Sequence, residues 1–426
     1  MAQTIFPYPW QMPGIRRAVQ ILKERDLLLM MSDTGTGKTV MTLEAMRRLG
    51  RRFLVVCPKS VKTAWTRTAE AMNVSGMIGV VNPERLLHSN PYVRNRKQWI
   101  LEKGATIVYD EVHKGCSGHN TKATHLLAMT KAYGYPVVAL SATLADSPLK
   151  MRGVGFLAGL HGYRLPLFWD WCRDMGCFVK PGIPGLHFPK GEAGRQRMLE
   201  LHKALAPCAV RLKFADIPDF PDSVLEVNVY DMSQRDKAEI NRIYREMGDA
   251  ISKGGSTVLT EQLRARQKTE LLKVPLLAEL IRDALGEGKA PVVFVNFRET
   301  LAKLAAELAG VPLSLIYGAQ SDRDAQVDAF QNGESRALLA MIQAGGLGLS
   351  LHDTSGERPR VSFITPNFSA VEFTQTLGRI RRAGGSPVVQ TVVLAAGTIE
   401  ERIHAALRGK LGNLSALTDG DLTPTD

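Results

Sequence analysis

The sequence is poor in cysteine and has no long apolar run. Five cysteines are scattered over 426 residues without a Cys-x-x-Cys pair. Such sparse usage excludes a disulfide-rich secreted scaffold and suits a reducing compartment. No run reaches the roughly 18 apolar residues that a membrane-spanning helix needs, and residues 1–30 lack the pattern of a signal peptide. We therefore expect a cytoplasmic protein without a membrane partner.

The cysteines also offer little for a metal ion. Cys172 and Cys177 are the nearest pair, with His187 beyond them, and this is poor spacing for a zinc site. Buried or half-buried thiols explain these residues more simply. We expect no structural metal.

The composition is that of an ordinary globular protein with an excess of positive charge. Hydrophobic residues make up 45% and charged residues 23% of the chain, and the length allows two or three domains. The net charge is +12. A charge of this size favours a polyanionic partner, most simply nucleic acid, although a generally basic enzyme would carry it too.

Short apolar segments alternate with helical patterns along most of the chain. They lie at 27–31, 53–57, 77–81, 106–109 and 136–140 in the first half, and at 224–230, 291–296, 313–317, 337–341, 361–365 and 388–394 in the second. They are too short for buried helices, and the first-half segments are rich in β-branched residues, so we predict buried strands. Strands that alternate with helices indicate parallel, doubly wound sheets. The predicted fold class is α/β, with two such domains in tandem.

One region interrupts the alternation. Residues 145–216 contain many aromatic side chains and a stretch rich in proline and glycine at 180–190. We predict helices and a loop there, inserted into the first domain, and a linker at Ile217–Pro221. The expected domains are therefore 1–216 and 217–426.

The segment Ser32–Thr39 reads Ser-Asp-Thr-Gly-Thr-Gly-Lys-Thr and lies between an apolar run and a helical pattern. Strand, glycine loop and helix together form the context of a phosphate-binding loop. Lys38 can reach the β- and γ-phosphates of ATP, and the Thr39 hydroxyl can ligate Mg²⁺. The residues expected to hold the nucleotide are Thr34, Gly35, Thr36, Gly37, Lys38 and Thr39.

Polar residues follow two later strands of the first domain. Asp110 and Glu111 end the strand 106–109, and Ser141 and Thr143 follow the strand 136–140. The carboxyl ends of parallel strands face the ligand crevice of such a sheet. We predict that Asp110 holds Mg²⁺ and that Glu111 is the general base for the attacking water. Ser141 and Thr143 could bond this pair and relay the state of the nucleotide; a helix cap is the simpler alternative for them.

The second domain supplies candidate arginines. Gln375, Arg379 and Arg382 fall at i, i+4 and i+7, which is one face of a helix. Guanidinium groups suit a γ-phosphate because they spread charge over the transferring oxygens. A solvated basic face or a patch for nucleic acid is the alternative.

Two further motifs are short. Gly345, Gly346 and Gly348 follow the strand 337–341 and would allow a ligand or a phosphate chain to approach the backbone closely. A strained turn is the alternative there. Gln11 precedes the phosphate loop, and its amide could read the edge of adenine; a surface role is the alternative.

Taken in order, these segments resemble the motifs of the superfamily 2 helicases and translocases. The correspondence runs through Gln11 (Q motif), 32–39 (I), 55–60 with Trp65 (Ia), 82–86 (Ib), 110–113 (II), 141–143 (III), 292–297 (IV), 345–351 (V) and 375–382 (VI). The chain looks most similar to the Snf-type, chromatin-remodeller-like DEAD/DEAH-box ATPases, because of 57–60 with Trp65, 344–351 and 397–403. Ser350 and the His113 of Asp-Glu-Val-His depart from the usual Snf-type pattern.

The resemblance implies two RecA-like lobes with ATP and Mg²⁺ in the cleft between them. It further implies a motor driven by ATP hydrolysis that translocates on double-stranded DNA in the cytoplasm, at a nucleoid or viral replication site of a prokaryotic host. Lys59, Ser60, Gly345, Gly346 and Gly348 are the candidate contacts to the nucleic-acid backbone, which such groups hold without reading sequence. A strand-separating DNA or RNA helicase, and a nucleotide-gated clamp that does not travel, are the alternatives.

Overall fold

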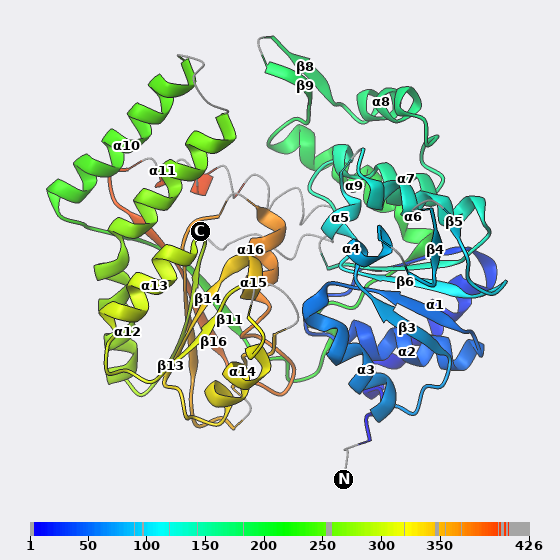
Figure 1. The fold of residues 1–426 in the computed structure, drawn as a ribbon, viewed down its shortest axis with the longest axis horizontal. Helices are drawn as coiled ribbons and strands as arrows, with labels where there is room; N and C mark the ends of the chain where they lie inside the picture. Colours follow the sequence, from blue (N-terminus) through cyan, green and yellow to red (C-terminus); the bar gives the residue numbers. More distant parts are fainter. Residues whose placement is uncertain are drawn as a thin grey trace. The chain divides into compact units, whose positions relative to one another are not determined.

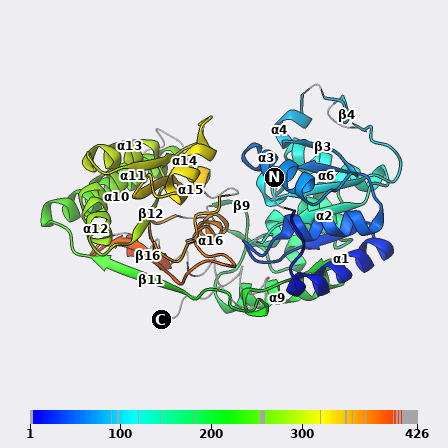
Figure 2. The ribbon, with the colours of Figure 1, turned by 90° about the horizontal axis from the view of Figure 1, so that it is seen from below.

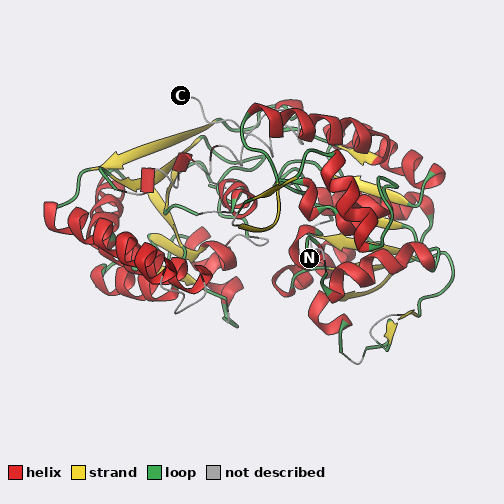
Figure 3. Ribbon diagram, turned by 90° about the horizontal axis from the view of Figure 1, so that it is seen from above, coloured by secondary structure: helices red, strands yellow, loops and turns green. Residues whose placement is uncertain are grey.

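The chain forms two compact units, each with its own hydrophobic core. The computed structural model describes residues 4–88, 90–95, 98–118, 120–142, 144–181, 183–252, 258–318, 320–345, 349–353, 355–367, 369–398, 400–401, 404–405 and 408. Unit 1 contains the described residues up to Pro218, and unit 2 those from Asp219 to Arg408. In each unit the strands of a central sheet lie among helices, as Figure 3 shows. No helix in these ranges is long and apolar enough to cross a bilayer.

Unit 1 is built on a six-stranded sheet in the order β10-β1-β7-β6-β2-β3, with every neighbouring pair parallel. Its strands are β1 (Leu27–Met30), β2 (Phe53–Val56), β3 (Met77–Val81), β6 (Thr106–Asp110), β7 (Val137–Leu140) and β10 (Ala209–Val210). The first five were predicted and are confirmed. The sixth was not predicted: β10 adds to the edge beside β1, at the end of the region expected to be an insertion.

Helices alternate with most of the strands of unit 1, as the sequence pattern predicts. They are α1 (Met12–Glu24), α2 (Lys38–Leu49), α3 (Lys62–Ala71), α4 (Pro83–Leu86), α5 (His113–Cys116), α6 (Lys122–Ala132), α7 (Arg152–Leu157), α8 (Leu165–Asp174) and α9 (Glu192–Leu205). Helix α1 shows why they dock. Its buried residues Ile15, Ala18, Ile21 and Leu22 recur on one face at helical spacing.

The region 145–216 contains a β-hairpin that was expected to be a loop. Strands β8 (Phe178–Lys180) and β9 (Ile183–His187) pair antiparallel, because the chain reverses direction within its proline- and glycine-rich stretch. Figure 1 shows this hairpin beside α8. Phe168, Cys172 and Cys177 form a small core there. A second short hairpin joins β4 (Val93–Arg94) and β5 (Gln98–Trp99).

Unit 2 has its own parallel sheet in the order β11-β16-β15-β12-β14-β13. The strands are β11 (Ser223–Tyr230), β12 (Ala290–Val295), β13 (Leu313–Ile316), β14 (Ala337–Met341), β15 (Arg360–Ile364) and β16 (Val388–Ala395), and all six were predicted. The long edge strand β11 is clear in Figure 2. The helices are α10 (Gln234–Ser252), α11 (Val258–Leu272), α12 (Val274–Gly286), α13 (Arg298–Glu307), α14 (Arg323–Gln331), α15 (Ile342–Gly345) and α16 (Ala370–Leu377).

Candidate active site

The phosphate loop lies between β1 and α2, as predicted. Gly35 and Gly37 have φ of 91° and 79°, a left-handed backbone that glycine adopts without strain. Lys38 is the first residue of α2, and its Nζ donates to the carbonyl oxygens of Ser32 at 2.9 Å and Asp33 at 3.0 Å. The lysine therefore lies across the loop that it would serve. Thr39 follows it on the first turn of the helix.

Residues 211–214, near the end of unit 1, form hydrogen bonds and an ion pair with this loop. The Ser32 hydroxyl accepts from the Leu212 backbone N–H at 3.0 Å. The Asp33 carboxylate pairs with Arg211 at 2.8 Å and accepts from the Phe214 N–H at 2.9 Å. These anchors were not predicted. Apolar residues alternate with polar ones over residues 210–214, which indicates an extended segment, but nothing in that pattern shows that it contacts the phosphate loop.

Gln11, which precedes the phosphate loop in the sequence, also supports it. Its Nε2 donates to the Thr36 carbonyl oxygen at 2.9 Å, its Oε1 accepts from the Tyr8 N–H at 2.9 Å, and the residue is 1% exposed. A Cβ added at Gly37 would collide with this amide. Two features therefore favour glycine at position 37: the left-handed backbone angle and the space that the Gln11 amide occupies. The adenine contact expected of Gln11 stays a prediction.

Asp110 and Glu111 lie at the carboxyl edge of the same sheet. Asp110 is the last residue of β6, and its Oδ2 accepts the indole N–H of Trp65 at 2.8 Å. Burial, together with the neighbouring Glu111 charge, raises the pKa of Asp110 to about 6. Glu111 has φ of 53°, which costs a non-glycine residue on the order of 1–2 kcal/mol. Strained backbone of this kind collects at functional sites.

His113 connects motif II to the next strand. Its Nδ1 lies 2.8 Å from the Ser141 hydroxyl and 3.4 Å from Oε2 of Glu111. Ser141 is 1% exposed and follows β7 directly. The expected link between Ser141 and the acidic pair therefore runs through His113. Thr143, its predicted companion, lies outside the described residues.

The predicted nucleic-acid contacts are described only in part. Lys59 is exposed in the short 3-10 helix η2 (Lys59–Val61), which follows β2, while the side chain of Ser60 is not described. Gly345 ends α15. Gly346 and Gly348 lie outside the described residues, so the glycine loop stays a prediction.

In unit 2 the predicted helix face is wrong. Helix α16 ends at Leu377, so Gln375 is helical but Arg379 and Arg382 lie beyond it. Gly378 takes the cap position, where a residue of low helix propensity favours an ending. The two arginines nevertheless come together: Nη1 of Arg379 and Nη2 of Arg382 donate to the Leu349 carbonyl oxygen at 3.5 Å and 2.8 Å. Burial and the charge of Arg379 lower the pKa of Arg382 to about 9.

The segment 349–351, whose first carbonyl oxygen accepts from these arginines, is also hydrogen-bonded to residues of α14 and β15. Gln331 of α14 donates to the Ser350 carbonyl oxygen at 2.8 Å, and Arg360 donates to that of Leu351 at 3.1 Å. Arg360 is 2% exposed and bonds Gln331 in turn at 2.8 Å. Both residues were missed, because nothing in the local sequence distinguishes them.

The donor set at the carboxyl edge of unit 1 suits Mg²⁺ and ATP. Asp110 and Glu111 bring two carboxylates together, and their mutual repulsion would be relieved by a hard cation, which prefers oxygen ligands. Thr39 and Asp110 are the residues that would hold it, beside the backbone N–H groups and the Lys38 ammonium for the phosphates.

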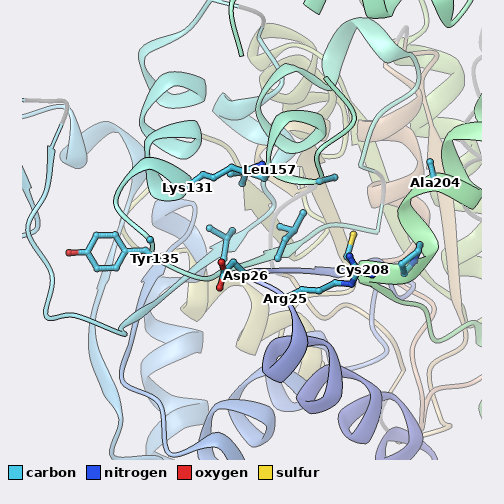
Figure 4. Close-up of a pocket in the computed structure, with 12 residues that line it drawn as sticks. Arg25, Asp26, Lys131, Tyr135, Leu157, Ala204 and Cys208 are labelled. Atoms are coloured by element: carbon cyan, nitrogen blue, oxygen red, sulfur yellow. The ribbon is translucent and has the colours of Figure 1, made fainter. Parts of the chain in front are cut away.

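A separate hollow opens at the opposite edge of this sheet. Its volume is about 280 Å³, and Figure 4 shows Arg25, Asp26, Lys131, Tyr135 and Cys208 around it. Asp26 and Tyr135 precede β1 and β7, so the hollow is at the amino ends of the strands. None of the predicted site residues lines it.

Comparisons with known proteins agree with this geometry. A family model described as helicase conserved C-terminal domain matches residues 272–384. The "Putative ATP-dependent RNA helicase L364" of Acanthamoeba polyphaga mimivirus is 29% identical over an alignment of 461 residues, which covers 97% of this chain and 84% of that protein. Dbp5 of S. cerevisiae, bound to RNA and ADP BeF3, has a TM-score of 0.52 at 15% identity, covering 95% of this chain and 92% of its own.

The comparisons indicate an ATP-hydrolysing enzyme of the helicase type and support a likeness to superfamily 2. Its two parallel α/β sheets are the tandem RecA-like folds that the sequence predicted. The SWI2/SNF2 ATPase core of Sulfolobus solfataricus in complex with dsDNA is also similar to this chain, with a TM-score of 0.40 at 17% identity over 98% of this chain and 94% of that one.

Proposed function

We propose that this chain is a superfamily 2 ATPase that uses ATP hydrolysis to translocate along double-stranded DNA. The observation that carries the ATPase half is the carboxyl edge of the unit 1 sheet, where Lys38, Asp110 and Glu111 follow strands of one parallel sheet. The duplex half rests on the net charge of +12 and on the Snf-type pattern at 57–60 with Trp65.

The residues would divide the chemistry as follows. Lys38 neutralises charge on the β- and γ-phosphates, and Thr39 and Asp110 hold Mg²⁺, which when bound screens the phosphate oxygens. Glu111 accepts the proton of the attacking water as the bond to the γ-phosphorus forms and the bond to the ADP oxygen breaks. The products are ADP and inorganic phosphate.

Arg379 and Arg382 would stabilise the charge that spreads over the transferring phosphoryl group, since guanidinium groups match these oxygens. Through them unit 2 would respond to the nucleotide that unit 1 holds. Alternate binding and release of the DNA backbone in each ATP cycle would then move the protein along the duplex.

A strand-separating helicase is the second candidate. One observation favours it: the mimivirus relative is named an RNA helicase. A helicase of this kind would show its highest ATPase stimulation with RNA or single strands, and would release a labelled strand from a forked duplex.

The deciding experiment compares ATPase rates with duplex DNA, single-stranded DNA, branched DNA and RNA over a range of salt. We expect the greatest stimulation by duplex DNA, falling steeply as salt rises. We also expect displacement of a triplex-forming strand without separation of the duplex. Glu111→Gln should bind ATP without turnover, and Lys38→Ala should abolish hydrolysis.

Other outcomes would overturn parts of the proposal. Strand release from the forked duplex would favour the helicase. Stimulation without triplex displacement would indicate a clamp that does not travel. Equal rates with and without every nucleic acid would exclude a motor, and normal turnover by folded Glu111→Gln would exclude the assigned site.

A further inference from the structure

The indole of Trp65 connects two segments of unit 1 that are far apart in sequence. Its Nε1–H donates to Oδ2 of Asp110 at 2.8 Å, and Trp65 is 1% exposed. An indole has one donor and no acceptor, so a buried tryptophan must find an acceptor for that single N–H. Here the acceptor is the carboxylate that the proposed function assigns to Mg²⁺.

A second buried tryptophan shows that a carboxylate is not needed for this purpose. Trp99 is 2% exposed, and its Nε1–H donates to the Leu126 backbone carbonyl oxygen at 2.9 Å. A carbonyl satisfies that indole in the same unit and at almost the same length. The Trp65 bond therefore acts on a residue of the proposed metal site, whereas the Trp99 bond does not.

The fold fixes Trp65 firmly against the sheet. Trp65 and Ala69 are buried four residues apart on one face of α3, and Val61, the last residue of η2, is buried just before that helix. Strands β2 and β6 are parallel neighbours with Val56 opposite Tyr109, so their ends lie at one edge. After β2 the chain passes through η2 into α3, where the indole of Trp65 contacts Asp110 at the end of β6.

The same short path carries Lys59. This lysine is exposed on η2 and is one of the predicted contacts to the nucleic-acid backbone. Between Lys59 and Trp65 the chain is continuously helical, through η2 and the first turn of α3. A displacement of either end of this segment therefore reaches the other without a flexible loop between them.

We propose that Trp65 is a positioning residue for Asp110 and that it couples the Mg²⁺ site to the nucleic-acid contact at Lys59. The indole N–H engages one carboxylate oxygen and leaves the other for the cation. When nucleic acid holds Lys59, the segment 59–71 holds Trp65, and Trp65 fixes the carboxylate. This coupling rests on the proposed function, whereas the positioning of Asp110 does not.

The test compares Trp65→Phe with Trp99→Phe. Each change keeps an aromatic ring in a buried site and removes one N–H bond, so the two variants should lose similar thermal stability. Mg²⁺ affinity is measured by calorimetry in the presence of ADP. We expect Trp65→Phe to weaken it at least about tenfold, the usual effect of losing a group that orients a metal ligand. Trp99→Phe should stay within about twofold of the unsubstituted protein, since the Trp99 indole donates to a backbone carbonyl oxygen and not to a predicted metal ligand.

The coupling is measured by the anisotropy of labelled duplex DNA with and without Mg²⁺ and a non-hydrolysable ATP analogue. The factor by which the nucleotide changes DNA affinity should fall at least about fivefold in Trp65→Phe and stay unchanged in Trp99→Phe. Equal behaviour of the two variants in both measurements would overturn the proposal. If the nucleotide does not change the DNA affinity of the unsubstituted protein, the proposed function fails. The Mg²⁺ measurement still decides whether Trp65 positions Asp110.

A spectroscopic measurement keeps the proposal testable even if Trp65→Phe does not fold. In the unsubstituted protein, Mg²⁺ added with ADP should perturb the N–H hydrogen bond of one indole, seen in the tryptophan bands of the ultraviolet resonance Raman difference spectrum. A difference spectrum without any tryptophan band would contradict the inference.

Discussion

Arg382 donates from Nη2 to the carbonyl oxygen of Leu349 at 2.8 Å, which places an arginine proposed to act on phosphate against the segment that follows the predicted glycine loop. Arg379 reaches the same oxygen from 3.5 Å, and burial together with the charge of Arg379 lowers the pKa of Arg382 to about 9. Two like charges therefore lie close together at one carbonyl group. An anionic phosphoryl group would relieve this repulsion, which is why we assign both side chains to it.

The first prediction concerns this pair. Arg382→Ala should lower ATP turnover on the order of 10³-fold, as loss of an arginine finger does, with a smaller effect on ATP affinity. Arg381→Ala is the matched control, because Arg381 instead donates to the Pro221 carbonyl oxygen at 2.8 Å and lies over the Phe220 ring. Steady-state ATPase assays with saturating nucleic acid decide it. If the two variants lose turnover equally, the assignment of Arg382 is wrong.

The sheets were predictable because their strands are short, apolar and mostly buried. Strand β12 is buried at every position, and its sequence alone excludes a half-exposed strand. Strand β10 was not predictable in the same way, since two residues are too few for a period. The site positions on strand ends followed from the sheets, because a parallel sheet brings carboxyl ends to one edge.

The contacts that hold the site together could not be predicted. Trp65 and Asp110 are 45 positions apart, and Arg211 and Asp33 are 178 apart by their numbers (110 − 65 and 211 − 33). No local pattern records such pairings. The end of α16 was predictable in principle, because Gly378 weakens the helix there, but the spacing of the arginines outweighed that signal.

The second prediction concerns an ion pair in the core of unit 2. Lys273 and Glu400 are 1% and 5% exposed in their side chains, and Nζ lies 2.7 Å from Oε1. Lys273→Met should destabilise unit 2 by about 3–5 kcal/mol, because it leaves a buried carboxylate without its cation. Lys273→Met with Glu400→Gln should recover most of that loss. Urea unfolding measures both.

An exposed pair provides the control for this measurement. Arg173 and Asp170 lie 2.7 Å apart with side chains 56% and 65% exposed, so Arg173→Met should change stability by less than about 1 kcal/mol. A double variant as unstable as Lys273→Met alone would mean that packing, and not the unpaired charge, dominates.

The third prediction concerns pH. Burial and Glu111 raise the pKa of Asp110 from 3.8 to about 6, so between these values the folded protein holds the proton more tightly than the unfolded chain. The free energy of unfolding should therefore fall as pH rises through this window. At pH 8, without nucleotide or Mg²⁺, Asp110→Asn should stabilise unit 1 on the order of 1–3 kcal/mol, and the gain should vanish near pH 4.

Asp353 provides the opposite case within the same chain. Burial raises its pKa, but hydrogen bonds from Ser355, Gly356 and Ser386 outweigh this and leave the pKa below its usual value. Asp353→Asn should therefore destabilise the protein at neutral pH, with a loss that shrinks under acid conditions. Melting temperatures recorded across pH test both variants. A destabilised Asp110→Asn at pH 8 would show that its hydrogen bond to Trp65 outweighs the cost of the buried charge.

The fourth prediction separates two reasons for glycine at position 37. Gly37→Ala should lose on the order of 1–2 kcal/mol from its φ of 79° and, in addition, push the Gln11 amide off the Thr36 carbonyl oxygen. Gly50→Ala is the control: its φ is 61°, but an added Cβ meets nothing within 4 Å. Both variants should melt earlier, whereas only Gly37→Ala should weaken ATP binding, by about tenfold or more for a loss above 1.4 kcal/mol. Unchanged ATP affinity in Gly37→Ala would mean that Gln11 does not hold the phosphate loop in its binding shape.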